Sequence, residues 1–323
     1  MKALAVFSGG LDSMLAAELI RAQGIDVVGF FFETPFFRAE RAVKSARLLQ
    51  LPLKVLDITE PHLEVVKKPR YGYGGNMNPC IDCHALMLRK AAERLAEEKA
   101  QFIITGEVLG QRPMSQNLRA LSTVAARSGR PELILRPLSA KLLPPTAPEI
   151  KGWVRRDQLL ALSGRSRKPQ MELAKALNIT EYPSPAGGCL LTDPVFSRRL
   201  KDLLSFRPDC HVREIELLKV GRHFRLGPGT KVVIGRNKKE NEEIFSLAGE
   251  SDLVIKVDSI PGPLVLVLGD LSRPMEELAV ALALSYSDAK DGEVAEVMLF
   301  MGGVERKESA PARPKSEFQS FMI

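Results

Sequence analysis

Short apolar runs alternate with helical patterns through the first part of the chain. The apolar runs have the length of strands and lie at residues 3–7, 27–32, 53–56, 102–104 and 133–135. Apolar residues at helical spacing occur near residues 11–23, 38–50, 81–99 and 115–128. Such alternation predicts an α/β fold in which helices wrap a parallel sheet and ligands bind at the carboxyl ends of the strands.

The pattern changes after residue 138. Prolines at 144, 145 and 148 rule out a continuous helix, and short helical patterns return at 154–162 and 170–177. This region is also basic. A run of one charge usually marks a solvated face. The surplus of positive charge here makes contact with a phosphate backbone an equal alternative, with Arg155 and Arg156 as the candidate residues.

From about residue 206 the order of elements is different. Strands are predicted at 231–234, 253–257, 264–268 and 294–300, and helices from 237 through 245 and at 275–289. This mixture predicts a small α+β domain. Residues 305–323 contain Pro311 and Pro314 and show no periodicity, which predicts a flexible tail. The expected parts are therefore 1–205, 206–304 and a tail at 305–323.

The composition restricts the class of protein. The 323 residues are enough for two domains, and 45% apolar with 26% charged residues is typical of a soluble globular chain. No apolar run reaches membrane-spanning length and no basic leader precedes the first strand, so the chain is expected to act in the cytoplasm, away from membranes. A net charge of +7 is a modest bias toward polyanions.

The turn after the first predicted strand carries the strongest chemical signal. Gly9 and Gly10 let the backbone approach a ligand closely, while Ser8, Ser13 and the first helical N–H groups can donate hydrogen bonds. The turn therefore reads as a phosphate cradle rather than an ordinary strand-turn-helix built from small residues. It lacks the lysine of a Walker loop and has Asp12 instead, which suits a magnesium ion beside bound phosphates.

The sequence Ser8-Gly9-Gly10-Leu11-Asp12-Ser13 resembles the PP-loop signature of the ATP pyrophosphatases. This resemblance implies an adenine nucleotide alpha hydrolase-like, Rossmann-like fold. It also implies an enzyme that splits ATP between the α and β phosphates and leaves AMP on an acceptor oxygen.

Three of the four cysteines can act together. Cys80 and Cys83 begin a predicted helix, where the helix dipole favours a thiolate, and Cys189 follows much later in the chain. Irregular spacing argues against a disulfide framework and favours metal ligands or reactive thiols. Three thiolates fit a [4Fe-4S] cluster with one iron left open.

Other roles for the cysteines stay open. A zinc site would need a fourth ligand, either His84 or Cys210 with His211. Cys80 and Cys83 could be a redox dithiol, and Cys80 with Cys189 could be a persulfide and resolving pair. His62 and His223 are interpreted as surface or packing histidines.

Further motifs place the first part of the chain close to one family. The segment Thr105-Gly106-Glu107-Val108-Leu109-Gly110-Gln111, the following Ser115–Leu118 and Arg136-Pro137-Leu138 stand in the order found in the ThiI family of tRNA 4-thiouridine synthases. The resemblance covers about residues 1–200. A cysteine pair with a distant third cysteine is similar to the cluster-dependent branch of the ThiI, MnmA and TtcA thiolation enzymes.

The resemblance implies an ATP-dependent tRNA sulfurtransferase. A uridine carbonyl oxygen attacks the α-phosphate of ATP, pyrophosphate leaves, and a sulfur nucleophile then attacks the adenylated base. Asp12 would hold Mg²⁺ over the transferring phosphate, and the adenine would lie near Phe30, with Gly106 and Gln111 closing the pocket. Sulfur would come from hydrosulfide on the open iron or from a persulfide on Cys189, so Asp12, Cys80 and Cys189 are the expected catalytic residues.

Partners follow from the same resemblance. The expected partners are tRNA and a sulfur donor, either sulfide or a persulfide carrier protein, and the chain could act as a homodimer. A full ThiI chain carries an RNA-binding THUMP region before its PP-loop, whereas this sequence begins at the PP-loop. The modified position and the RNA class therefore do not carry over from the family.

The run VVIGRNKKENEEI and the later Pro261-Gly262 turn resemble the NFACT-R module, an RNA-binding domain, over about residues 207–303. The resemblance implies phosphate contacts by basic residues of the second domain, unless the domain is structural with a basic face. The candidate contacts are Arg222, Arg225, Lys231, Arg236, Lys238 and Lys239. Two alternative functions remain: an RNA-binding factor with a nucleotide-binding switch domain, and a PP-loop ligase or thiolase acting on a small molecule.

Overall fold

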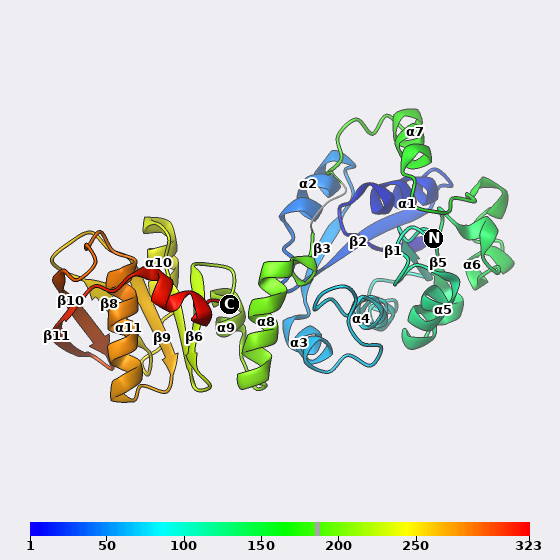
Figure 1. Cartoon of the computed structure of the whole chain (residues 1–323). Coiled ribbons are helices and arrows are strands. Elements are labelled where there is room, and N and C mark those ends of the chain that lie inside the picture. Colours follow the sequence, from blue (N-terminus) through cyan, green and yellow to red (C-terminus); the bar gives the residue numbers. More distant parts are fainter. Residues whose placement is uncertain (185–187) are drawn as a thin grey trace. The chain divides into compact units, whose positions relative to one another are not determined.

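The computed structural model describes residues 1–184 and 188–323, which form two compact units, Met1–Asp193 and Pro194–Ile323 (Figure 1). The division falls before helix α8 (Pro194–Phe206), not after residue 205 as expected. Asp202 on α8 accepts hydrogen bonds from Arg225 and Lys231 of the second sheet, which explains why α8 groups with the second unit. Each unit is described by itself below.

The first unit contains a five-stranded parallel sheet, as predicted. Its strands are β1 (Lys2–Val6), β2 (Asp26–Glu33), β3 (Leu53–Asp57), β4 (Phe102–Thr105) and β5 (Ile134–Leu135). The strand order is β3-β2-β1-β4-β5, and all the neighbouring pairs are parallel. The chain runs outward from β1 in both directions, so the carboxyl ends of β1 and β4 form the switch point where ligands bind in open α/β sheets.

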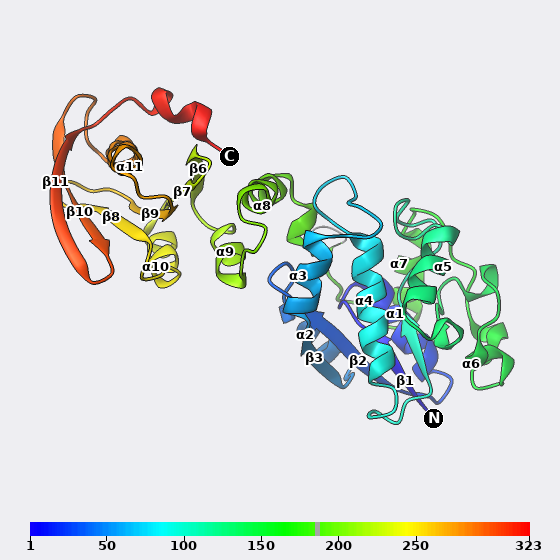
Figure 2. The ribbon, with the colours of Figure 1, turned by 90° about the horizontal axis from the view of Figure 1, so that it is seen from below.

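Helices cover both faces of this sheet (Figures 1 and 2). One core joins the sheet to α1 (Leu11–Arg21), α2 (Glu40–Leu48) and α7 (Lys168–Ala176), and the other joins it to α4 (Cys80–Glu93) and α5 (Leu118–Arg127). Strand β1 contributes Ala3 and Ala5 to the first core and Leu4 to the second, because alternate side chains of a strand face opposite sides.

The remaining elements of the first unit are short. Helix α3 (Thr59–Lys67) was not expected, and the pattern at 154–162 gives only a 3-10 turn. The other pieces are α6 (Ala147–Ile150), η1 (Pro131–Leu133), η2 (Ala140–Leu142), η3 (Arg156–Gln158) and η4 (Leu190–Thr192). No helix in residues 1–184 or 188–323 is long and apolar enough to cross a bilayer.

The second unit is an antiparallel sheet with helices on both faces, which agrees with the expected α+β domain. Its strands are β6 (Arg222–Gly227), β7 (Thr230–Ile234), β8 (Leu253–Val257), β9 (Leu264–Gly269), β10 (Val294–Met301) and β11 (Val304–Pro311), in the order β11-β10-β8-β9-β7-β6. Helix α11 (Arg273–Ser285) packs on one face. Helices α9 (Val212–Leu217) and α10 (Lys238–Ser246) pack on the other.

The flexible tail expected at 305–323 is not what the structure shows. Strand β11 pairs with β10 from Met301↔Val304 to Val294↔Pro311, and η5 (Lys315–Phe321) buries Phe318 in the core. No alternating hydrophobic pattern marks this segment, because β11 is a charged edge strand. It is fixed by backbone pairing and by ion pairs such as Arg306 with Glu276.

Candidate functional site

The turn between β1 and α1 has a conformation that requires glycine. Gly9 has a φ of +73°, and a Cβ built on it would come 2.6 Å from the Cα of Ala42 on α2. The Ser45 hydroxyl of the same helix donates a hydrogen bond of 2.8 Å to the Gly9 carbonyl. Helix α2 therefore fixes the shape of the turn.

The two serines of the turn hold its backbone. Ser13 Oγ donates to the Gly10 carbonyl at 2.8 Å, and Ser8 Oγ lies 3.3 Å from Ser13 Oγ. No side chain of the described residues caps the first turn of α1, which leaves its N–H groups available to an anion. Phosphate binding at this turn stays a prediction, which the free N–H groups of α1 permit.

Asp12 lies in the first turn of α1 and contacts a residue far along the chain. Its Oδ2 accepts a hydrogen bond of 2.9 Å from Gln111 Nε2. Asp12 Oδ1 and Gln111 Oε1 are both buried, and neither has a hydrogen-bond partner among the described residues. A buried oxygen that accepts no hydrogen bond destabilises the fold unless a cation or a donor binds it. Carboxylate and amide oxygens of this kind are ligands that Mg²⁺ prefers.

The end of β4 packs directly on the cradle. A Cβ on Gly106 would lie 2.5 Å from Ser13 N, so only glycine fits there. Phe30, in contrast, lies inside β2, because pairing with β3 continues to Glu33↔Asp57. Its carbonyl accepts the Phe7 N–H at 2.9 Å, and its ring is buried in the core. The structure thus brings Gly106 and Gln111 to Asp12 and Ser13, and it places Phe30 in the sheet interior.

A buried ionic network lies next to Gly106. Glu107 Oε2 accepts hydrogen bonds from Arg136 Nε at 2.9 Å and Thr105 Oγ1 at 3.1 Å, while Glu107 Oε1 lies 2.9 Å from His84 Nδ1. Burial alone would raise the pKa of Glu107, but the charges and hydrogen bonds of Arg136 and His84 lower it to about 2. Glu107 is therefore ionised at neutral pH and fixes the His84 ring.

This network predicts an acid-sensitive contribution to stability. The folded-state pKa of Glu107 is lowered, so the contribution is present above its unfolded value of about 4.3 and is lost as the pH falls toward 2. The difference in unfolding free energy between wild type and Glu107→Gln should shrink over that interval. Urea titrations at several pH values would measure it, and a constant difference would contradict the assignment.

Two side chains make hydrogen-bond contacts with the sulfur atoms of Cys80 and Cys83. Cys80 is the first residue of α4, and Asn78 Nδ2 donates to its Sγ at 3.1 Å. His62 Nε2 lies 3.2 Å from Cys83 Sγ, and the His62 ring packs between Phe36 and Phe37. Burial lowers the pKa of His62 to about 4, so its ring is neutral. Sequence reasoning found the packing role of His62 and missed the contact with Cys83.

The third thiol lies within electrostatic reach of this pair. Burial, followed by the charges of Cys189 and Cys80, raises the pKa of Cys83 well above its ordinary value. Burial raises the pKa of Cys189 to about 11, although the nearby Arg112 opposes the rise. Asn76 Nδ2 donates to the Thr192 carbonyl at 2.8 Å, which joins the loop before Cys80 to the segment of Cys189. Nevertheless, no three His, Cys, Asp or Glu side chains of the described residues are placed to hold one metal ion.

The cysteines and the Gly9–Gly10 turn are linked through residues that lie between them. His84 follows Cys83 on α4 and contacts Glu107, whose neighbour Gly106 packs on the cradle. On the other side, Arg112 lies near Cys189 and is adjacent to Gln111, which bonds to Asp12. Two series of contacts and sequence neighbours therefore run from the cysteines to the Gly9–Gly10 turn within the first unit.

The basic residues predicted to bind RNA divide into two groups. Arg156 pairs with Glu149, Arg225 bonds to both oxygens of Asp202, and Arg236 pairs with Glu240. Lys231 is buried, and it also meets Asp202 at 3.1 Å. These cations are neutralised within the protein. Arg155, Lys238 and Lys239 are exposed, and Arg222 is half-buried; of these four only Lys238 approaches a carboxylate, Glu242 at 3.9 Å, among the described residues.

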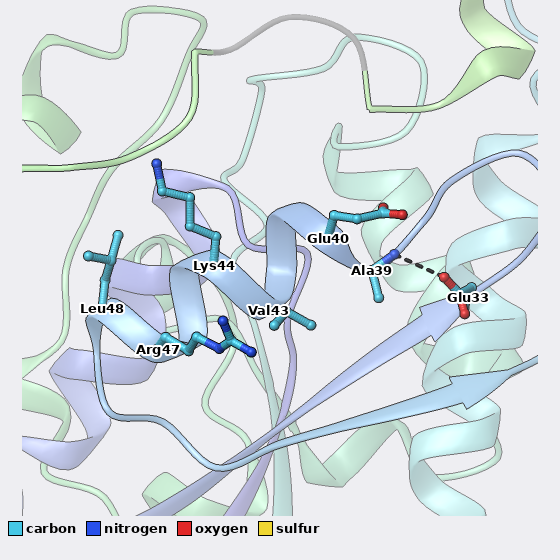
Figure 3. A pocket seen from close by; sticks show the side chains of 7 residues that line it. All are labelled: Glu33, Ala39, Glu40, Val43, Lys44, Arg47 and Leu48. Carbon is cyan, nitrogen blue, oxygen red and sulfur yellow. Dashed lines mark hydrogen bonds between the residues drawn. The ribbon is translucent and has the colours of Figure 1, made fainter. Parts of the chain in front are cut away.

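A cavity of about 580 Å³ lies beside helix α2 (Figure 3). It is bounded by the end of β2 and one side of α2, where Glu33 accepts the Ala39 N–H at 3.0 Å. None of the nucleotide-binding or sulfur residues predicted from the sequence lines it.

Comparison with family models decides the assignment of both units. Residues 1–141 match the model described as thiamine biosynthesis protein (ThiI), and residues 221–322 match the NFACT protein RNA binding domain (NFACT-R_2). Each unit thus contains a segment that matches a family model, ThiI in the first unit and NFACT-R_2 in the second. Both resemblances inferred from the motifs are thereby confirmed. The cradle, Cys80, Cys83 and Gln111 fall inside the ThiI match, and Cys189 lies beyond it.

Curated relatives resemble the ThiI domain over a limited length. The chain is 32% identical over 149 residues to a probable tRNA sulfurtransferase of Thermoanaerobacter sp. (strain X514), covering 42% of this chain and 36% of the relative. It is 35% identical over 107 residues to the tRNA-specific 2-thiouridylase MnmA of Syntrophomonas wolfei subsp. wolfei, covering 31% of this chain and 32% of the relative. The chain thus spans about a third of the length of these relatives.

Among solved structures, the chain is similar to a 4-thiouridine synthetase in complex with RNA and bound ATP. The identity is 21%, the match covers 67% of this chain and 52% of that chain, and the TM-score is 0.38.

Proposed function

We propose that this protein is an ATP-dependent tRNA sulfurtransferase that adenylates a uridine carbonyl oxygen and replaces it with sulfur, giving a 4-thiouridine or 2-thiouridine type of product. The observation that carries the proposal is the continuity between the phosphate cradle and the cysteines through Gly106, Glu107 and His84. The ThiI match and relatives named as a tRNA sulfurtransferase and a 2-thiouridylase support it. The enzyme would act in the cytoplasm, as a monomer or a homodimer.

The cradle would bind the phosphates of ATP. Backbone N–H groups of the Gly9–Gly10 turn and of the first turn of α1 would donate to them, with the Ser8 and Ser13 hydroxyls beside them. Asp12 Oδ1 and Gln111 Oε1, which lack partners among the described residues, fit a Mg²⁺ ion that offsets the phosphate charge. The uridine oxygen bonds to the α-phosphorus, and the bond to pyrophosphate breaks.

Sulfur would then replace the activated oxygen. A sulfur nucleophile adds to the base carbon, and AMP leaves with the former carbonyl oxygen and the electron pair of its bond. The thiols of Cys80, Cys83 and Cys189 would hold a [4Fe-4S] cluster, with zinc as the lesser alternative. A bound cluster would supply an iron at which sulfide is delivered. The contacts of Asn78 and His62 with two of the sulfurs suit thiolate ligands, which accept hydrogen bonds.

A scheme without a cluster uses the same thiols. Cys80 and Cys189 would then form the persulfide and resolving pair, with a persulfide carrier protein as the donor. The carrier would transfer its outer sulfur to one thiol and keep its own thiol, and delivery of that sulfur to the base would leave a Cys80–Cys189 disulfide. The raised pKa of Cys189 favours the protonated thiol when no metal is bound, which weakens this scheme.

Activity would be tested by pyrophosphate release. Purified protein with ATP, sulfide and unmodified tRNA should release pyrophosphate only when the tRNA is present, and nucleoside mass analysis should then detect a thiouridine. ATP hydrolysis to phosphate, or no turnover, would instead support a nucleotide-binding switch domain. Equal pyrophosphate release without RNA would support a small-molecule ligase or thiolase.

The cofactor gives a separate prediction. Protein purified without oxygen should be brown and contain iron and acid-labile sulfide. The colour should be lost in Cys80→Ala, Cys83→Ala and Cys189→Ala. Cys210→Ala is the matched control, because Cys210 is a buried cysteine of the second unit and should leave the iron content unchanged. A colourless anaerobic protein that contains zinc would rule out the cluster.

A further inference from the structure

Most cations of the second unit that could contact RNA already face carboxylates. Ion pairs within the described residues join Arg225 and Lys231 to Asp202, Arg236 to Glu240, Arg213 to Asp252, Arg306 to Glu276 and Lys307 to Asp258. A paired cation must leave its carboxylate before it can bind a phosphate, and that loss offsets the new contact. The binding surface should therefore be sought among cations held without a carboxylate.

Two such cations converge on one aromatic ring. The guanidinium of Arg222 lies 5.2 Å from the centroid of Tyr286, and the ammonium of Lys315 lies 5.3 Å from the same centroid. Neither side chain is within ion-pair distance of an acid in the described parts of the chain. Contact with an aromatic face orients a cation and leaves its charge and most of its N–H donors available.

The three side chains come from separate elements, β6, the end of α11 and η5, which contact one another. Arg222 begins the edge strand β6, Tyr286 follows the last turn of α11, and Lys315 begins η5. The carbonyl end of α11 also favours nearby cations. This placement brings together two charges that are distant in the sequence.

The ring and the terminal segment are both fixed by packing. Phe224, which is fully buried, meets Tyr286 edge-on at 5.7 Å. Ser285 Oγ donates to the Arg313 carbonyl at 2.5 Å, and the Ile323 N–H donates to the His223 carbonyl at 3.0 Å. Lys315 is therefore presented by an ordered segment, and the group exists before any ligand arrives.

We propose that Arg222, Tyr286 and Lys315 form a clamp for backbone phosphates of RNA. Arg222 and Lys315 each donate to a phosphodiester oxygen, and Tyr286 positions both cations at its ring. This assignment rests on the proposed function for the choice of RNA, and the match to an RNA binding domain supports it. The phosphate contacts are therefore expected at this clamp and not at Arg225 and Arg236, whose charges are neutralised by Asp202 and Glu240.

The test is the salt dependence of tRNA binding by the full chain, measured by fluorescence anisotropy of labelled tRNA. Each lost phosphate contact lowers the slope of log K against log salt by about 0.7–0.9. The double variant Arg222→Gln, Lys315→Gln should therefore lower it by about 1.5. The control Lys201→Gln, Lys290→Gln removes the same charge from exposed positions of the same unit and should change the slope by less than half as much.

Two further variants test the role of the ring. Tyr286→Phe keeps the aromatic face and should bind tRNA like wild type. Tyr286→Leu changes no charge but releases both cations, so it should weaken binding several-fold. Equal binding by Tyr286→Leu and wild type would overturn the role of the ring.

Other outcomes are equally decisive. An equal loss in both double variants would show an effect of net charge alone and would overturn the clamp. So would specific displacement of tRNA by inorganic phosphate at constant ionic strength, which would indicate a free-phosphate site. Absence of tRNA binding by the wild type would overturn it as well. If tRNA binds through Arg222 and Lys315 but no thiouridine forms, the clamp is supported and the proposed sulfurtransferase activity is the part that fails.

Discussion

Replacement of Asp12 by asparagine should lower RNA-dependent pyrophosphate release by roughly 100-fold or more, because loss of one preorganised charge at a reacting phosphate has effects of this size. Asp12 Oδ1 is buried without a hydrogen-bond partner among the described residues, which is the position that the proposed function gives to Mg²⁺. The amide can still accept from Gln111, and the fold should be preserved. Binding of tRNA should be nearly unchanged, which separates catalysis from RNA binding.

Asp26→Asn is the matched control. Asp26 is exposed at the amino end of β2, whereas the cradle follows the carboxyl end of β1 in the same parallel sheet. Its replacement removes the same charge. Pyrophosphate release should stay within about twofold of wild type, since surface substitutions have small effects. If Asp12→Asn retained the wild-type rate over a range of Mg²⁺ concentrations, Asp12 would be removed from the active site.

Replacement of Arg136 by methionine should have the largest effect on stability. Arg136 Nε and Nη2 donate to Glu107 and to the Leu121 carbonyl, and both charged side chains are buried. The variant leaves Glu107 ionised without its main partner, which costs about 3–5 kcal/mol in buried ion pairs. The unfolding midpoint in urea should fall accordingly.

The protein provides its own probe for this experiment. Its single tryptophan, Trp153, lies in the first unit and packs near Phe102, so tryptophan fluorescence reports the unfolding of that unit. Arg94→Met is the control, because its pair with Glu97 is exposed and contributes less than about 1 kcal/mol. Equal midpoints for the two variants would show that the Arg136–Glu107 pair does not stabilise the fold.

Much of the first unit could be predicted from local patterns. A strand and a helix each repeat apolar residues at a fixed spacing, and glycines mark turns with positive φ, which other residues adopt rarely. The parallel sheet, the cradle and its position after β1 follow from these signals. The C-terminal strand β11 could not be found in this way, since its charged residues satisfy the backbone of β10 without contributing an apolar face.

Contacts between distant residues gave no such signal. His62 reads as an ordinary packing residue until α3 brings it to Cys83, and Glu107 gains its low pKa only when Arg136 is folded against it. Arg225 appeared free because Asp202, its partner, precedes the domain boundary that the sequence suggested.

The sequence by itself determined the chemistry that is available: a glycine turn that can bind phosphate, an aspartate that can bind magnesium, three thiols and an excess of basic residues. Tertiary structure decided which of these groups lie together and which charges remain free. The physical reason is that turn conformation and hydrophobic spacing are local properties. Burial, ion pairing and the distance between thiols depend on segments that meet only after folding, as Arg222 and Lys315 do at Tyr286.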